Sequence, residues 1–215
     1  MPTPSFPPDT LDPEGTPLWI AELANDDPNH ALHVVRGLEP AEVLDALGVK
    51  PHLVRPCELP AEKPDEWTSL PGAALGVKPG TAAALVAGRV GEWTFVYDDS
   101  GHTVSDEETV ALSVGGRAAA TSVFTINADT SLVYAVDGEE VANINGDNLD
   151  LAEDLPGLPP ELRTAFEVAG TVELDYLEPG EPDYDILMRA ICALAGLTFT
   201  PDELRRLPLL GAILG

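Results

Sequence analysis

The stretch AAATSVFTINADTSLVYAVDGEEVANI, residues 118–144, decides the fold class. Its β-branched and aromatic residues gather in three short runs, which predict three antiparallel strands. Asp137-Gly138 separates the last two runs, and this dipeptide suits the two-residue turn of a β-hairpin. We therefore predict a hairpin over Leu132–Ile144. The period of two places three of its residues on one face: Leu132, Tyr134 and Val136.

Further strands and helices are predicted on both sides of this hairpin. Apolar or alternating runs predict strands at residues 30–36, 83–90 and 93–99. Capping residues and prolines predict helices that begin near Thr16, Pro40, Ser105, Pro160, Asp183 and Thr200. This order indicates an α+β fold. We expect a mostly antiparallel sheet of about five to seven strands, with helices packed against one side of it.

The domain organisation is read from the prolines. Residues 1–16 hold five prolines and no lysine or arginine, which predicts a disordered or extended N-terminal arm rather than a secretory signal. Residues 17–215 are expected to form a single α+β domain. Within it, residues 49–80 contain six prolines and little periodicity, so we expect a long irregular connection that can include one short strand.

The charge of the chain excludes several classes of partner. The 215 residues carry 37 Asp and Glu against 11 Lys and Arg, a net charge of −26. Such a chain repels phosphate backbones and anionic lipid, so neither nucleic acid nor a membrane is an expected partner. The acidity is uneven, because residues 137–185 hold 15 acidic residues and only Arg163 as a base. A basic protein partner is therefore the expectation.

The two cysteines, Cys57 and Cys192, lie far apart and in no metal-binding or redox spacing. A reducing, cytoplasmic location is therefore expected. Cys192 falls within an apolar helical pattern and is expected to be a core residue.

The segment HVVRGLEPAEVLDALG, residues 33–48, resembles an uncharacterised, mainly actinobacterial family with the pattern R-G-L-x-P-x-E-V-L-x-x-L-G. Three later segments fit the same family: GEWTFVYDDSG, SVFTINADTSLVYAVDGEEV and DILMRAICALAGLTFTPDEL. These motifs carry no catalytic signature. The resemblance implies a cytoplasmic, single-domain protein of unknown function.

The segment NINGDNLDLAED, residues 143–154, has the composition of a calcium loop. Its register fails, however, because placing Gly146 at the sixth position of such a loop puts Val141 first and Ala152 last. We predict no tight calcium site there. An irregular oxygen cage remains the alternative, and it would use Asp147, Asp150, Glu153 and Asp154.

The histidines and aromatic residues offer few catalytic arrangements. His30 and His33 are expected on opposite faces of a strand, which disfavours a zinc pair. His102 follows Asp98 and Asp99 in a predicted turn, where a base and its orienting carboxylate can meet. No phosphate-binding loop or nucleophile elbow is found, so no cofactor is expected. The alternating aromatic residues Trp93, Phe95 and Tyr97 are expected to face the core.

Two functional hypotheses follow. The first is an acidic, non-enzymatic interaction protein, immunity-like, inhibitor-like or a scaffold, that binds a basic protein. Its expected partner-binding residues are Glu173, Asp175, Tyr176, Glu178, Glu181 and Tyr184. The alternative is a hydrolase or metal-assisted enzyme that uses carboxylates near Asp98, Asp99 and His102. A buried carboxylate with a shifted pKa inside a cleft would favour it. The oligomeric state is left open.

Overall fold

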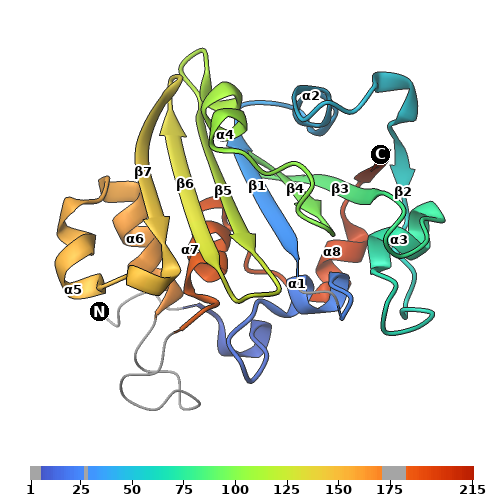
Figure 1. Ribbon diagram of the computed structural model, residues 1–215, viewed down its shortest axis with the longest axis horizontal. Helices are drawn as coiled ribbons and strands as arrows, with labels where there is room; N and C mark the ends of the chain where they lie inside the picture. Colours follow the sequence, from blue (N-terminus) through green and yellow to red (C-terminus); the bar gives the residue numbers. More distant parts are fainter. Residues whose placement is uncertain (1–5, 27–28, 171–182) are drawn as a thin grey trace.

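The computed structural model describes residues 6–26, 29–170 and 183–215. Within these residues, eight strands form one antiparallel sheet in the order β2-β8-β3-β4-β1-β5-β6-β7 (Figure 1). The strands are β1 His30–Arg36, β2 Arg55–Cys57, β3 Ala83–Val90, β4 Trp93–Asp98, β5 Ala118–Phe124, β6 Thr130–Val136, β7 Glu139–Asn145 and β8 Leu209–Leu214. The helices are α1 Leu18–Leu23, α2 Pro40–Ala46, α3 Leu70–Leu75, α4 Asp106–Ser113, α5 Leu151–Asp154, α6 Pro160–Ala169, α7 Ile186–Ala195 and α8 Pro201–Arg206.

The α+β class is confirmed, but the expected count of five to seven strands is wrong. The described residues contain eight strands because the apolar segment Leu209–Leu214 forms β8, which the sequence reading did not assign. This strand lies inside the sheet, between β2 and β3, and pairs with both. The C-terminal segment is therefore structural core rather than a tail.

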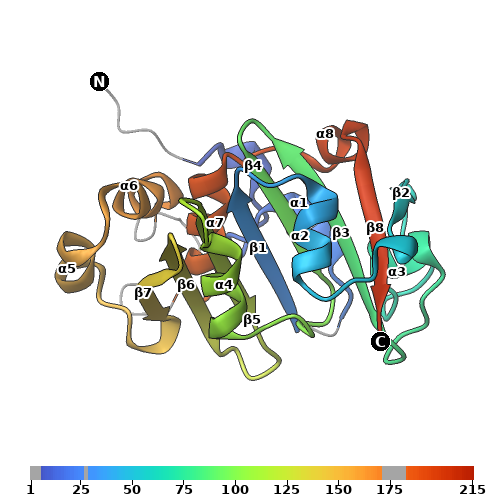
Figure 2. The same cartoon turned by 90° about the horizontal axis from the view of Figure 1, so that it is seen from above.

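Helices cover both faces of the sheet, which corrects the expectation of one covered face. Leu32 and Val34 of β1 pack in one apolar cluster with α1, α6 and α7. Val35, the next residue, packs in a second cluster with Val43 and Leu44 of α2. Successive residues of β1 therefore pack into two separate apolar cores, one on each face of the sheet. Figures 1 and 2 show α4 and α7 on opposite sides of β5 and β6.

The predicted hairpin is confirmed, and its turn explains the choice of residues. β6 and β7 pair in antiparallel register on either side of Asp137-Gly138. Asp137 has φ 52° and Gly138 has φ 82°, so both turn residues adopt the left-handed region that a type I′ turn requires. Leu132, Tyr134 and Val136 all contact the same apolar cluster. This face therefore points into the core as expected.

The N-terminal segment and the proline-rich connection both contact the domain. Phe6 is buried, and its N–H donates to the Val168 carbonyl over 2.7 Å. Within residues 49–80 the structure contains β2 and α3. β2 lies at an edge of the sheet, where Pro56 needs no ladder partner. Cys192 is buried in the larger core cluster as predicted.

Candidate functional site

Asp98 organises the turn that follows β4. Its side chain is fully buried and accepts four hydrogen bonds within that turn. Two come from the N–H and hydroxyl of Ser100, over 3.0 and 3.2 Å. The other two come from the N–H and hydroxyl of Thr103, over 2.8 and 2.7 Å. Both carboxylate oxygens are therefore engaged, so Asp98 is a positioning residue rather than a base open to substrate.

A directed chain of hydrogen bonds runs from this turn into the core through His33. The Thr103 hydroxyl donates to Asp98, so it can only accept from His33 Nε2, which lies 2.7 Å away. On the other side, the Thr109 hydroxyl donates to Thr121 over 2.7 Å, and Thr121 lies 2.9 Å from His33 Nδ1. His33 is therefore neutral and protonated at Nε2. Burial lowers its pKa to about 4.

The two histidines of β1, His30 and His33, do not come together. As predicted for opposite faces of one strand, their rings have different neighbours. The His30 ring stacks on Phe124 with centroids 5.6 Å apart, whereas His33 contacts the two threonines of the hydrogen-bonded chain. The alternation of β1 therefore separates the two imidazoles.

His102 is brought to Asp98 only through a serine. The Ser100 hydroxyl lies 3.0 Å from His102 Nδ1 and 3.2 Å from the Asp98 carboxylate. A catalytic triad needs the histidine between the carboxylate and the hydroxyl, so that it can carry the proton away from the nucleophile. Here the hydroxyl stands in the middle. The order of contacts does not support a serine nucleophile at this turn.

Asp99 has a different environment from its neighbour. Its Oδ1 accepts from the Ala84 N–H over 2.8 Å, and its Oδ2 accepts from the Ser69 hydroxyl. Both donors are neutral, and no ion pair to Asp99 occurs in the described part of the chain. Burial raises its pKa to about 6. A carboxyl group with this pKa exchanges its proton close to neutral pH.

Ser69 reaches Asp99 because it caps helix α3. The Ser69 hydroxyl oxygen accepts from the Gly72 N–H over 2.8 Å while its proton goes to Asp99. A Cβ at Gly72 would lie 2.8 Å from the Ser69 oxygen, so glycine is needed for this close approach. The Ser69 hydroxyl thus links the first turn of α3 to the Asp99 carboxylate.

Asp99 lines a hollow of about 290 Å³, which we call the Asp99 pocket. Its walls come from the α1–β1 loop, the residues before α3, the α3–β3 loop and the turn after β4. Six side chains give it its chemistry: Asn25, Trp67, Ser69, Lys78, Asp99 and His102. Trp67 is 57% exposed. The site is therefore assembled from four separate parts of the sequence.

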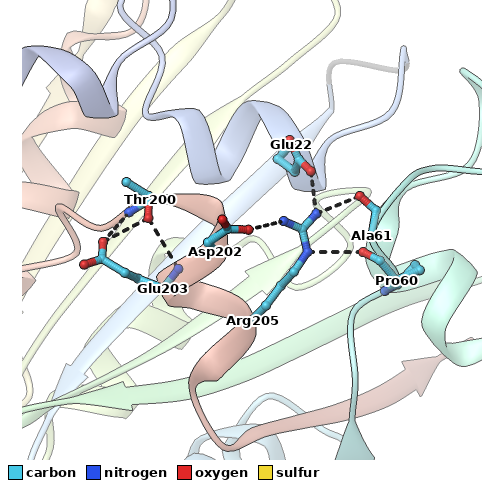
Figure 3. A network of polar contacts seen from close by, with 7 residues as sticks. All are labelled: Glu22, Pro60, Ala61, Thr200, Asp202, Glu203 and Arg205. Atoms are coloured by element: carbon cyan, nitrogen blue, oxygen red, sulfur yellow. Dashed lines mark hydrogen bonds and ion pairs between the residues drawn. The ribbon is translucent and has the colours of Figure 1, made fainter.

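The irregular segment before α3, which carries Trp67, is hydrogen-bonded to α8 and to the end of α1. Figure 3 shows Arg205 of α8 donating to the carbonyls of Pro60 and Ala61, over 3.3 and 3.0 Å. The same guanidinium pairs with Glu22 of α1 over 2.5 Å. Nearer the pocket, Lys63 donates to the Ala24 carbonyl over 2.5 Å. These contacts hold the pocket wall against α1 and α8.

A second hollow, of about 300 Å³, lies beside α6 and α7. Arg36 lies 5.3 Å from the centroid of the Trp93 ring and 3.2 Å from the Glu161 carboxylate. The buried Tyr134 hydroxyl also donates to Glu161. Phe95 and Tyr97 continue the Trp93 face into the core, as predicted. Because Arg36 and Glu161 neutralise each other, this hollow presents less unpaired charge than the Asp99 pocket.

Comparison with known families gives one match. A model for a family of unknown function, DUF6461, matches residues 17–154. The chain belongs to this family. No curated protein and no solved structure matches the chain. The matched part of this DUF6461 member contains every residue of the Asp99 pocket, whereas α6, α7, α8 and β8 lie outside it. No helix in the described residues is long and apolar enough to span a membrane.

The acidic loop at residues 143–154 uses its oxygens for its own turns. In this DUF6461 member the Asn145 side chain accepts from the Asp147 N–H over 2.9 Å. The Asp150 N–H donates to Asp154 over 2.9 Å, and the Glu153 N–H donates to Asp150 over 3.3 Å. Among the described residues, no group of three His, Cys, Asp or Glu side chains is placed to hold a metal. The contacts favour turn chemistry.

Most of the expected partner-binding residues lie outside the described part of the chain: Glu173, Asp175, Tyr176, Glu178 and Glu181. The sixth, Tyr184, is 39% exposed and lies just before α7. Buried Arg189 contacts both flanks of the segment 171–182. It donates to the Gly170 carbonyl over 2.9 Å and forms an ion pair with Asp183. Both flanks of the segment are therefore fixed at one place on the domain.

The segments at the two ends of the sheet in this DUF6461 member differ in charge. Residues 137–170, which form β7, α5 and α6, contain nine acidic residues and one arginine. Residues 49–92, which include β2, α3 and β3, contain five acidic and five basic residues and are neutral. Figure 1 shows β7, α5 and α6 at one end of the molecule and β2 and α3 at the other. We call the first the acidic end.

Proposed function

We propose that this DUF6461 member is a non-enzymatic interaction protein that acts in the cytoplasm. It binds a basic protein through the acidic end and through residues 171–185, as an immunity-like inhibitor or a scaffold. The difference in charge between the two ends of the sheet carries this proposal. Solubility alone is served by charges spread over the surface, whereas a one-sided field steers an oppositely charged partner to one end.

The Arg189 contacts support the inclusion of residues 171–185. The segment begins at the end of α6, which belongs to the acidic end, and Arg189 ties its two flanks together. Residues 171–185 add six acidic residues to the nine of the acidic end, and the two flanks that Arg189 contacts lie beside α6. Charges that lie together add their fields, so the segment strengthens the attraction for a basic partner.

Affinity capture followed by cross-linking tests the proposal. The bait is compared with two variants that each lose four carboxylates by Glu→Gln changes. One is neutralised at the acidic end, at Glu139, Glu140, Glu153 and Glu167. The matched control is neutralised at exposed positions of the other end, at Glu58, Glu62, Glu66 and Glu92. A carboxyl-to-amine reagent should cross-link lysines of a basic partner to the acidic end. Only the variant neutralised at the acidic end should fail to capture this partner.

A partner that is acidic, or that is captured equally by both variants, would contradict the proposal. We further infer that the R-G-L-x-P-x-E-V-L-x-x-L-G pattern at residues 36–48 is typical of the family and that its members are mainly actinobacterial. A survey of family members for this pattern and their source tests that inference.

A second candidate function is a hydrolase or metal-assisted enzyme at Asp98, Asp99 and His102. The observation that favours it is the buried Asp99 carboxyl in its pocket, because its pKa of about 6 suits a general base. Asp98 positions the turn, and His102 lies at the pocket wall. Hydrolysis of ester and phosphate substrates should then rise with pH through about 6 and be lost in Asp99→Asn. Activity that survives this change would count against Asp99 as the base.

A further inference from the structure

Asp99 is a buried carboxylate that lacks a positive partner. It is 9% exposed, and both of its hydrogen-bond donors, Ser69 and the Ala84 N–H, are neutral. Within the described residues, no lysine, arginine or histidine forms an ion pair with it. Buried charges in proteins are normally paired or bound to a cation. Burial of Asp99 without a positive partner also raises its pKa to about 6.

A buried acceptor that has no donor lies in the same pocket. The Oδ1 atom of Asn25 is buried and has no hydrogen-bond partner in the described part of the chain. Its Nδ2 donates to the Trp67 carbonyl over 3.0 Å, and this contact fixes which end of the amide is the oxygen. The pocket therefore contains two buried acceptor groups, Asp99 and Asn25, that a ligand with N–H donors would satisfy.

Trp67 adds an aromatic face to this pair of acceptors. Its indole is 57% exposed, but its backbone is held at both polar groups. The N–H donates to Asp65 over 3.0 Å, and the carbonyl accepts from Asn25. An exposed tryptophan on a fixed backbone, beside a carboxylate, is the arrangement that attracts organic cations by cation–π contact.

We propose that the Asp99 pocket binds an organic cation, an ammonium or guanidinium group on a short aliphatic chain. The cationic N–H groups are satisfied by the carboxylate of Asp99 and the amide oxygen of Asn25, and the chain or cation contacts Trp67. A volume of about 290 Å³ accommodates such a group but is at the small end for small-molecule sites. The net charge of −26 raises the local concentration of cations at the surface.

The other charged groups at the pocket agree with this ligand. Lys78 is exposed at the rim, where it can meet an acidic group on the ligand without blocking the floor. The charge of nearby His102 lowers the pKa of Asp99, and the neighbouring Asp98 raises it. An anion in the pocket would be repelled by the negative charge of Asp99. A metal ion would have a single carboxylate there, because the oxygens of Asp98 are engaged in their own turn.

This inference does not depend on the proposed docking surface, because the pocket lies outside the acidic end. Calorimetry and tryptophan fluorescence with butylguanidinium and butylammonium test it at pH 7.5, with neutral pentanamide as the matched control. We expect saturable, millimolar or tighter binding of the two cations and none of the amide. Asp99→Asn should weaken binding about tenfold or more, and Trp67→Leu about threefold. Asp147→Asn, on the exposed loop, should leave it unchanged.

Two further arms complete the experiment. Agmatine is compared with N-acetylarginine amide. Tighter binding of agmatine identifies a free amine as the ligand, and tighter binding of the blocked amino acid identifies an arginine side chain of a protein. The proposal is overturned if pentanamide binds as well as the cations, if neither cation saturates, or if Mg²⁺ or Ca²⁺ displaces them stoichiometrically. Trp67→Leu alters only an exposed side chain, so the test stands even if Asp99→Asn fails to fold.

Discussion

Arg189 and Asp183 form a two-pronged ion pair in the interior of the domain. Nη1 of Arg189 lies 3.1 Å from Oδ1 of Asp183, and Nη2 contacts Oδ2. The three remaining N–H groups donate to the carbonyls of Gly15, Ala169 and Gly170. All five donors of a fully buried guanidinium are therefore used. One side chain joins the N-terminal segment, the end of α6 and the start of α7.

The first prediction concerns this ion pair. Arg189→Met should lower the free energy of unfolding by about 3–5 kcal/mol, because it leaves Asp183 buried without its partner. Urea denaturation of wild type and variant measures the difference. The double variant with Asp183→Asn should recover part of the loss, since the uncompensated charge is then gone.

A matched control for this prediction is Arg89→Met. The Arg89–Glu39 pair is much more exposed than Arg189–Asp183, so its loss should cost less than about 1 kcal/mol. If both arginine variants lose similar stability, the burial of Arg189 does not determine the cost of breaking its ion pair.

The second prediction concerns the ionisation and tautomer of His33. Nitrogen NMR should show a neutral imidazole protonated at Nε2 at pH 6, with titration near pH 4, because burial opposes its positive charge. Protonation at Nδ1, or titration of His33 near pH 6.5, would contradict the hydrogen-bond directions assigned to Thr103 and Thr121.

The third prediction concerns the pH dependence of stability through Asp99. Its folded-state pKa, about 6, lies above the ordinary 3.8 of the unfolded chain. Its contribution to stability is therefore complete below pH 3.8 and is lost as the pH rises through 6. Relative to wild type, Asp99→Asn should gain about 2–3 kcal/mol of unfolding free energy between pH 4 and pH 7. A pH-independent difference between the two proteins would argue against the shifted pKa.

The fourth prediction concerns calcium. Titration calorimetry with Ca²⁺ at moderate salt should show no stoichiometric binding at residues 143–154, because the ligand positions of a calcium loop are not met. Micromolar binding that disappears in Asp147→Ala would establish the irregular oxygen cage instead.

The fifth prediction concerns the kinetics of partner binding. Neutralising Glu173, Asp175, Glu178 and Glu181 should slow association with the basic partner more than it speeds dissociation, because these charges act at a distance. Added salt should have the same effect, since screening shortens the field to about 10 Å at 0.1 M. Stopped-flow or surface-based rate measurements separate the two steps. If neither the neutralised charges nor added salt changes the association rate, the acidity serves solubility and does not steer a partner.

Local signals made several elements predictable. Ser105 caps α4 through the Glu108 N–H, and Thr200 forms a capping box with Glu203, both as the sequence patterns indicate. β8 was missed because its short apolar run, with Gly211 inside it, has no period that separates strand from helix. Its state is decided by distant partners in β2 and β3.

The candidate site was predictable only in part. Asp98, Asp99 and His102 come together because they are neighbours in one turn. The signals for α3 were present in Ser69 and Gly76, which lie at its two ends, but the surrounding prolines obscured them. Asn25 and Trp67 reach the pocket by long-range contacts with no local pattern. The different roles of Asp98 and Asp99 depend on burial and on their donors, which sequence adjacency does not reveal.

The position of β8 also has a consequence for how the chain folds. Arg55 of β2 pairs with Gly211 of β8, more than 150 positions later, and within the described residues β8 is the only strand that pairs with β2. Contacts of such sequence separation raise the contact order and slow folding, because a long loop must close before they form. The β6–β7 hairpin is joined by a two-residue turn, so it forms without closing a long loop. We therefore expect the local hairpins, β6–β7 and β3–β4, to form before β2 joins the sheet.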